Sequence, residues 1–296
     1  PDTTPSAAKY AAKYAVMPAH NNPPGEKFVM SEMVEISRDG HVLEVRLNKP
    51  KVNAIDHEMS RALGEAFRQL RDDDDLHVGI ITAAGERIFS AGWDLQSLDS
   101  GEAKLDEWWD DGDYGEGGFA GLTENWSLNK PVIGALNGLV IGGGFEIALA
   151  CDLLIAAEHV EFALPEMPLG IIPDAGAIQR LPRRIPHNIA MEMLFLGRRM
   201  KADEAAHYGL VNKVVPAADL MREAREWAGQ LAWAAPLAMQ SVKEVIRHIE
   251  CRPTEAAFAA MRKDDLPTYR AMLKSDDAAE GIKAFVEKRE PVFKGH

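Results

Sequence analysis

Two glutamates in apolar surroundings are the residues of this sequence best placed to do chemistry. Glu146 follows a run of glycines, Gly142–Gly144, in the stretch NGLVIGGGFEIALACD. Glu166 follows further along, directly after Pro165, in FALPEMPLG. Two carboxyl groups that converge beside amide donors are able to move protons at a carbon next to a carbonyl group. The spacing along the chain does not by itself establish that the two side chains converge.

The glycine run indicates where such amide donors would come from. Glycine lets the backbone turn sharply and lets another group approach an N–H closely. The run stands between a strand pattern and a helix pattern, and the first amides of a helix are unpaired and favour negative charge. Such amides bind a phosphate or stabilise an oxyanion. IGGGFE is neither GxGxxG nor followed by GK[ST], so nucleotide-binding motifs fit poorly. A tight turn for close helix packing is the alternative interpretation.

A third segment, RIFSAGWDL (87–95), also combines small residues that expose the backbone with a nearby acidic side chain. A strand pattern is followed by the small residues Ala91 and Gly92, and then by Trp93 and Asp94. A plain β-turn is the alternative interpretation here.

The elements that must position these residues alternate between strand and helix patterns up to about residue 200. Residues 34–48 alternate apolar and polar side chains around Asp39-Gly40, which predicts a β-hairpin, and 57–74 carry apolar residues at helical spacing. This alternation predicts an α/β core with largely parallel strands over 34–225 and a C-terminal helical region over 226–296. Residues 1–33, with the repeat AAKYAAKY, are interpreted as a flexible extension or a cloning remnant.

Composition restricts the class of protein. The formal net charge of −13 over 296 residues argues against non-specific binding to nucleic acid or to an anionic membrane. Apolar runs stop well short of a membrane span. The two cysteines, Cys151 and Cys251, form no disulfide framework, which favours a reduced, cytoplasmic protein, and neither has the neighbours that a metal site requires.

The three segments together resemble the signatures of the crotonase (enoyl-CoA hydratase/isomerase) superfamily, in its order and spacing. They are FSAGWDL, KPVIGALNGLVIGGGFEIALACD and FALPEMPLGIIPDAGAIQRLPRRI, supported by LNKPKVNAID and by AFVEKREPVFKGH at the end. The resemblance covers about residues 34–296. Within the superfamily, GGFAGLTE, LGRRMKADEAAHYGLVNKVV and EKREPVFKG are most similar to the carnitinyl-CoA dehydratase branch.

The resemblance implies a ββα spiral core, a C-terminal helical trimerisation region, and a homotrimer or a dimer of trimers. It implies an acyl-CoA thioester substrate whose enolate is held in an oxyanion hole made by the backbone amides of Trp93 and Gly143. Glu146 and Glu166 occupy the positions of the two catalytic glutamates of hydratase members. Coenzyme A enters as part of the substrate, and no separate cofactor or metal is expected.

The family positions also imply contacts with coenzyme A. Lys51, Ala91 and Asp94 are candidates near its adenine or pantetheine arm, and Lys288 matches a lysine that in relatives reaches the CoA phosphates. Solvated surface lysines are the alternative interpretation for Lys51 and Lys288.

The expected reaction is reversible dehydration of a 3-hydroxyacyl-CoA to a 2-enoyl-CoA, with carnitinyl-CoA and crotonobetainyl-CoA as the expected pair. A general short-chain enoyl-CoA hydratase is an alternative. Asp174 stands where many hydratases have glycine, and this third acid leaves enoyl-CoA isomerase activity open as a further alternative. A non-enzymatic RNA-binding relative would need a basic surface, and a non-enzymatic CoA-binding relative would be expected to lack one of the glutamates.

The segment 99–116 holds eight acidic residues and one lysine, together with aromatic side chains. Aromatic faces attract quaternary ammonium groups, so this segment suits a cationic acyl group. The alternative is a solvated acidic loop whose tryptophans cap the core. The candidates for the acyl pocket are Trp108, Trp109, Tyr114, Phe119 and Asp174.

Overall fold

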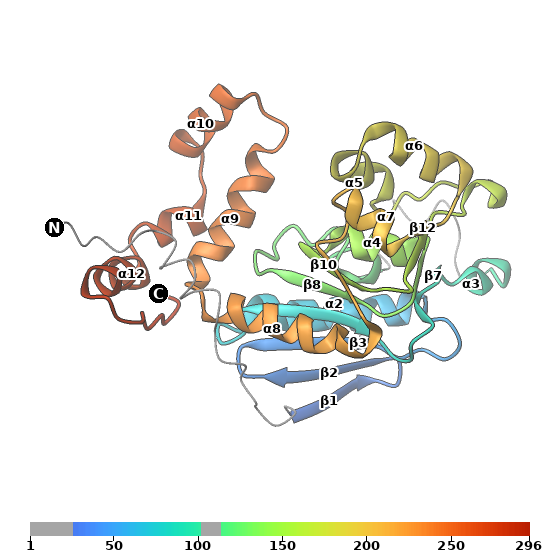
Figure 1. The fold of residues 1–296 in the computed structure, drawn as a ribbon, viewed down its shortest axis with the longest axis horizontal. Helices are drawn as coiled ribbons and strands as arrows, with labels where there is room; N and C mark the ends of the chain where they lie inside the picture. The colour runs from blue at the N-terminus through green and yellow to red at the C-terminus, as the bar shows by residue number, and fades with distance from the viewer. Residues whose placement is uncertain (1–25, 102–113) are drawn as a thin grey trace.

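The computed structural model of the protein describes residues 26–101 and 114–296, and its centre is a large, mostly parallel sheet (Figure 1). The strands lie in the order β1-β2-β3-β5-β8-β10-β13. The first pairs are antiparallel, and every pair from β3 onward is parallel, as predicted. The bounds are β1 Glu26–Ser31, β2 Val34–Asp39, β3 Val42–Leu47, β5 Val78–Ala83, β8 Val132–Leu136, β10 Leu153–Ala157 and β13 Lys213–Val215.

The hairpin at the start of the sheet confirms one prediction and corrects another. Asp39 pairs with Val42, and Gly40 at φ 55° makes the tight turn between β2 and β3. Strand β1 pairs with β2 along residues 26–31, so the extension predicted for 1–33 is wrong in its last residues. Residues 1–25 lie outside the described residues.

A second, smaller sheet has the order β12-β11-β9-β6, and β4 pairs with β7 apart from it. Each of β5, β8 and β10 in the large sheet is followed by a strand of the small sheet, β6, β9 or β11. Successive turns therefore advance along both sheets together, which is the predicted ββα spiral. The bounds are β4 Ala54–Ile55, β6 Ile88–Ser90, β7 Gly92–Trp93, β9 Leu139–Ile141, β11 Glu161–Ala163 and β12 Met200–Lys201.

Helices cover the sheets and carry the chain between them. Helix α2 begins where the side chain of Asp56 accepts a hydrogen bond from the N–H of Met59, and it packs on the large sheet, as does α8. The bounds are α2 His57–Asp72, α3 Leu95–Asp99, η2 Phe119–Gly121, α4 Gly143–Ala150, η3 Met167–Leu169, α5 Ala177–Arg184, α6 His187–Leu196, α7 Ala202–His207, η4 Ala217–Asp219 and α8 Leu220–Trp233.

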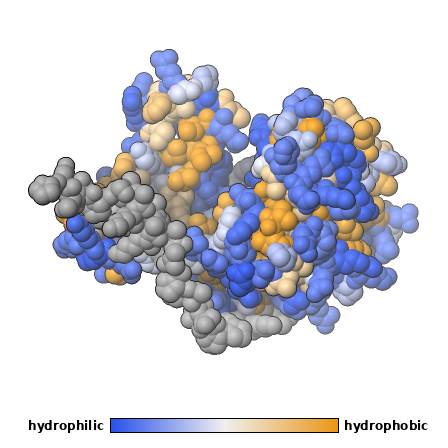
Figure 2. Space-filling model, in the orientation of Figure 1, coloured by the Kyte–Doolittle hydropathy of each residue, from blue (hydrophilic) through white to orange (hydrophobic). Residues whose placement is uncertain are grey.

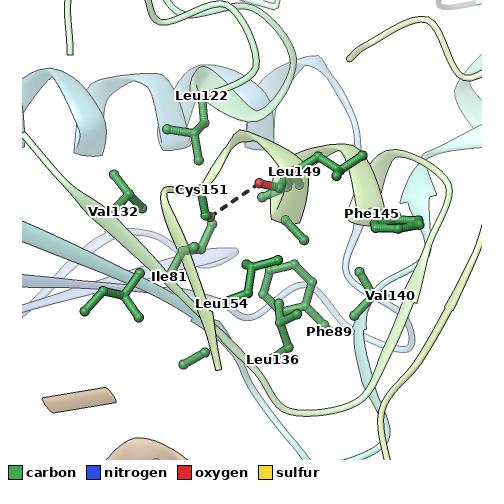
Figure 3. Close-up of a cluster of buried hydrophobic side chains, with 14 of the residues drawn as sticks. Ile81, Phe89, Leu122, Val132, Leu136, Val140, Phe145, Leu149, Cys151 and Leu154 are labelled. Carbon is green, nitrogen blue, oxygen red and sulfur yellow. Dashed lines mark hydrogen bonds between the residues drawn. The ribbon is translucent and has the colours of Figure 1, made fainter. Parts of the chain in front are cut away.

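Helix α4 is apolar on nearly every side and lies inside the core, which is why its single acid is notable. Phe145 packs against Phe162 with ring centroids 5.1 Å apart, and Phe89, Leu136 and Val140 belong to the same buried cluster (Figure 3). The thiol of Cys151 donates to the carbonyl of Ile147, and burial raises its pKa to about 12. The core therefore holds α4, and with it Glu146, in a fixed place.

The last helices extend away from the two sheets (Figure 1). They are α9 Pro236–Ile249, α10 Thr254–Lys263, α11 Pro267–Met272 and α12 Asp276–Glu287. The boundary predicted at residue 225 falls inside α8, which packs on β3, β5, β8 and β10 and belongs to the core. Hydrophobic side chains gather over α9 on the face shown in Figure 2. The exposed apolar residues of α9 include Val242 and Ile246.

Candidate active site

The two glutamates of the sequence analysis meet at the start of α4. Glu146, only 4% exposed, lies in the first turn of α4, and its Oε1 accepts a hydrogen bond of 3.0 Å from the N–H of Ala177. Glu166, 8% exposed, follows β11, and its Oε1 lies so close to Gly142 that a β-carbon there would be 2.8 Å away. The other oxygen of Glu166, Oε2, is buried with no hydrogen-bond partner among the described residues.

A third carboxyl group belongs to the same cluster. Asp174 stands in the loop between η3 and α5 and is half-buried. Its charge acts on both glutamates and raises the pKa of each. The structure therefore brings together Glu146, Glu166 and Asp174, which the sequence had singled out separately.

Burial sets the protonation of this cluster. It raises the pKa of Glu146 to about 8, with the charges of Glu166 and Asp174 acting in the same direction. The N–H of Ala177 and the charge of Arg180 oppose this rise. Burial also raises the pKa of Glu166 to about 7, and it raises the pKa of Asp174 above its ordinary value. Carboxyls with raised pKa values in one cluster can exchange protons near neutral pH.

The two backbone segments chosen as oxyanion donors lie against each other. Gly92 adopts φ 85°, and a β-carbon on it would lie 2.4 Å from the amide nitrogen of Gly143. A β-carbon on Gly143 would meet the ring of Phe119 at 2.7 Å. Only glycine allows this approach, which brings the segment carrying Trp93 to the first turn of α4. At that turn an N–H has no acceptor within the helix.

Trp93 is held from the other side by strand β4. Ile55 pairs with Trp93, and the N–H of Asp94 donates to the carbonyl of Ile55 at 2.9 Å. The side chain of Asp94 forms an ion pair of 2.8 Å with Lys49, which also binds Asp56 at the start of α2. This pairing fixes the loop that carries the Trp93 amide.

Aromatic side chains form one wall beside Trp93. The ring of Tyr114 lies 6.2 Å from that of Trp93, 5.9 Å from that of Phe119 and 4.5 Å from that of His57, measured between centroids. Tyr114 and Phe119 are both buried. Trp108 and Trp109, the other aromatic candidates, lie outside the described residues.

The candidates for coenzyme A contacts are spread more widely. Lys51, exposed and at φ 72°, lines a pocket of about 350 Å³ that lies after the carboxyl ends of β3 and β5. Ala91 donates its N–H to Val52 beside this region, and Asp94 is engaged by Lys49. Lys288, exposed at the end of α12, is far from β7 and α3 within the chain (Figure 1).

Sequence reasoning missed Arg180 and the amide of Ala177. The guanidinium of Arg180 donates to the carbonyl of Thr123 and lies 5.8 Å from the centroid of the Trp126 ring. Burial lowers its pKa, while the charge of Glu146 acts in the opposite direction. Gly176, at φ 132°, leaves the space that Arg180 needs, since a β-carbon there would clash with the guanidinium. A glycine four residues before the first arginine of AIQRLPRR was the available signal.

Two absences apply to the described ranges, 26–101 and 114–296. No helix within them has the length and apolar character to cross a bilayer. No group of three or more histidine, cysteine or acidic side chains within them is arranged to hold a metal ion.

Comparison with known proteins agrees with this geometry. The chain is 51% identical to the carnitinyl-CoA dehydratases of Salmonella heidelberg and Salmonella typhimurium, over 90% of this chain and the whole of each relative. An enoyl-CoA hydratase structure from Mycobacterium tuberculosis superposes with a TM-score of 0.80 at 33% identity, covering 90% of this chain and all of that one. A probable enoyl-CoA hydratase/isomerase from Mycobacterium abscessus gives 0.79 at 37% identity, with the same coverage. Residues 37–296 match the enoyl-CoA hydratase/isomerase family, and the chain belongs to that family.

Proposed function

We propose that this protein catalyses the reversible dehydration of carnitinyl-CoA to crotonobetainyl-CoA. The chain is a hydro-lyase of the enoyl-CoA hydratase type, and its 51% identity to carnitinyl-CoA dehydratases supports the specific acyl group. The single observation that carries the chemistry is the convergence of Glu146 and Glu166 where Gly92 meets Gly143. Two proton-transfer groups beside paired backbone amides are what elimination of water from a thioester requires.

In the proposed reaction, the thioester oxygen lies between the N–H groups of Trp93 and Gly143. The ionised Glu166 removes the α-proton, and the electron pair passes toward the thioester oxygen, where the two amides stabilise the enolate. The protonated Glu146 gives its proton to the β-hydroxyl group, the C–O bond breaks, and water leaves as the double bond forms. Loss of one such amide donor costs ~10²–10³ in rate in comparable sites.

The order of the pKa values supports these roles. Near neutral pH the higher pKa of Glu146 favours its protonated form, whereas Glu166 gives up its proton more readily. The pair then carries one proton, as both directions of the reaction require. Hydration starts with the proton on Glu166 and with Glu146 ionised. Both directions therefore need a pair of carboxyls that holds one proton, and they should depend on pH in the same way.

Coenzyme A is proposed to run past Lys51 and Ala91, with Lys288 reaching it from another subunit of a trimer or a dimer of trimers. Exposed apolar residues on the last helices support such an assembly, since monomeric proteins rarely expose contiguous apolar surface. We assign the protein to the cytoplasm, and the reaction needs no cofactor besides the coenzyme A of its substrate.

A second candidate function is double-bond isomerisation. It is favoured by Asp174, a third acid whose charge acts on both glutamates. An isomerase would move the double bond of a 3-enoyl-CoA with no uptake or loss of water.

The test is a comparison of acyl-CoA substrates with the intact enzyme. Crotonobetainyl-CoA and crotonyl-CoA are compared by the loss of the absorbance of the enoyl thioester. We expect kcat/KM to be higher for crotonobetainyl-CoA. Equal or better turnover of crotonyl-CoA would assign a general short-chain hydratase. Isomerisation of a 3-enoyl-CoA without hydration would assign an isomerase.

A further inference from the structure

The proposed substrate carries its positive charge very close to the reacting carbons. In crotonobetainyl-CoA the quaternary ammonium is attached to the carbon next to the β-carbon. If Glu166 acts at the α-carbon and Glu146 at the β-carbon, that ammonium must lie within a few ångströms of the two glutamates. The part of the site beyond the β-carbon therefore has to accommodate a bulky cation that forms no hydrogen bonds.

Among the described residues, Asp174 is an acidic residue besides the two glutamates whose charge acts at this site. It belongs to the loop that leads into α5, and Ala177 of that helix donates to Glu146 at 3.0 Å. The loop is fixed locally, because the side chain of Gln179 donates to the carbonyl of Asp174 at 3.1 Å and the N–H of Ile178 lies 3.4 Å from the carbonyl of Pro173. Asp174 thus stands three residues before the amide that binds Glu146, on a backbone that is held in place, and its charge reaches both glutamates.

No protein cation neutralises Asp174 among the described residues. The ion pairs of this part of the chain do not include it. The half-buried guanidinium of Arg180 donates to the carbonyl of Thr123 and faces the ring of Trp126. A second, independent observation points to a ligand at this site. Oε2 of Glu166 is buried and has no hydrogen-bond partner among the described residues.

We infer that Asp174 selects for a cationic acyl group by placing a carboxylate beside the quaternary ammonium of the substrate. This inference rests on the proposed function and adds the residue that confers its specificity. Attraction between opposite charges is strong in a partly buried site and weak in water, so an unpaired carboxylate there favours a cationic tail over an uncharged tail of the same shape. Glu146 and Glu166 share one proton and together contribute a single negative charge that moves between them during the reaction, whereas the charge of Asp174 stays in place.

The experiment compares two substrates that differ in charge but not in shape. They are crotonobetainyl-CoA and 5,5-dimethylhex-2-enoyl-CoA, in which a tert-butyl group replaces the trimethylammonium group. We expect the unmodified enzyme to prefer the cationic substrate. In Asp174→Asn, which keeps the shape, the ratio of kcat/KM for the cationic substrate to kcat/KM for the neutral one should fall about 10- to 100-fold, mainly through KM. Both values are measured at the pH optimum of each variant, because loss of the Asp174 charge also lowers the pKa of both glutamates. Asp174→Glu, which keeps the charge, should retain part of the preference.

The matched control is Asp203→Asn, which removes the same charge from an exposed position in α7 and should leave kcat/KM unchanged for both substrates. If the unmodified enzyme does not prefer the cation, the proposed function fails. If it does prefer the cation, but Asp174→Asn lowers kcat/KM equally for both substrates or for neither, the role of Asp174 is overturned and the proposed function stands. Melting temperatures of all variants separate loss of folding from loss of selectivity.

Discussion

At the scale of single residues, the proposed roles of Glu146 and Glu166 make their protonation set the pH dependence of the reaction. Below about 7 both carboxyls hold a proton, and above about 8 both lose it. Only the singly protonated pair can carry out acid–base catalysis. We therefore predict a narrow bell-shaped profile of kcat/KM between these limits, the same for hydration and dehydration. A flat profile from pH 6 to 9 would contradict the assignment.

Arg180 should set the alkaline limb of that profile. Its charge lowers the pKa of Glu146, so removing it in Arg180→Met should raise that pKa and move the alkaline limb to higher pH. The control is Arg183→Met, one turn from Gln179 on the exposed side of the same helix, which should leave the profile in place. Loss of rate with no movement of the limb would indicate that Arg180 only supports the fold.

Glu146 should also lower the stability of the fold at high pH. In the unfolded chain this carboxyl loses its proton near 4.5, whereas the folded state retains it until about 8. Between these values the folded state binds more protons than the unfolded state, so stability falls as pH rises. Glu146→Gln removes this effect while its carbonyl can still accept from Ala177. We predict that chemical denaturation shows the variant gaining on the order of 3–4 kcal/mol relative to the parent between pH 5 and 8.

At the scale of elements, the site depends on the close approach of β7 to α4. Gly92→Ala would place a β-carbon against the amide of Gly143 and should push the two loops apart, lowering kcat ~10²-fold or more. Gly85→Ala is the matched control, because Gly85 also has a positive φ of 79° but no atom within 4 Å of an added β-carbon. Both variants carry backbone strain of about 1–2 kcal/mol. A similar kcat for the two variants would mean that the approach is not needed.

Several elements could be predicted from the sequence, because their signals are local. The hairpin turn at Gly40, the amphipathic helix α2 and the glycine-led helix α4 each follow from residue type and period. Strand β13, only three residues long, was missed because the helical pattern on both sides of it dominates. Helix α8 was assigned partly to the C-terminal region, since its amphipathic pattern does not indicate which surface it covers.

The site was predictable in its acids but not in its electrostatics. Glu146 and Glu166 stand out as acids in apolar surroundings, and both prove to be buried. Arg180 looks like one of several basic residues in AIQRLPRR, and only the fold shows that it turns inward to Thr123. The contact between Gly92 and Gly143 depends on the packing of segments far apart in sequence, which no local pattern encodes.

At the scale of the whole molecule, the last helices expose apolar side chains that a single chain leaves uncovered. Ile282 and Val286, one turn apart on α12, are 70% and 73% exposed. We predict that the double variant Ile282→Asp with Val286→Asp shifts the protein from an oligomer to a monomer in size-exclusion chromatography with light scattering. Glu226→Lys, an exposed change on α8, should leave the mass unchanged. A monomeric parent protein would contradict the proposed assembly.

The most direct test of the central claim is the separation of catalysis from binding at the two glutamates. Glu146→Gln and Glu166→Gln keep the size of each side chain and remove its ability to exchange a proton. For each variant, kcat for hydration is measured together with the Kd of a saturated acyl-CoA by calorimetry. We predict that kcat falls ~10²–10⁴-fold in each while Kd stays within a few-fold of the parent value. Near-full kcat in either variant would contradict a mechanism in which both carboxyls transfer protons.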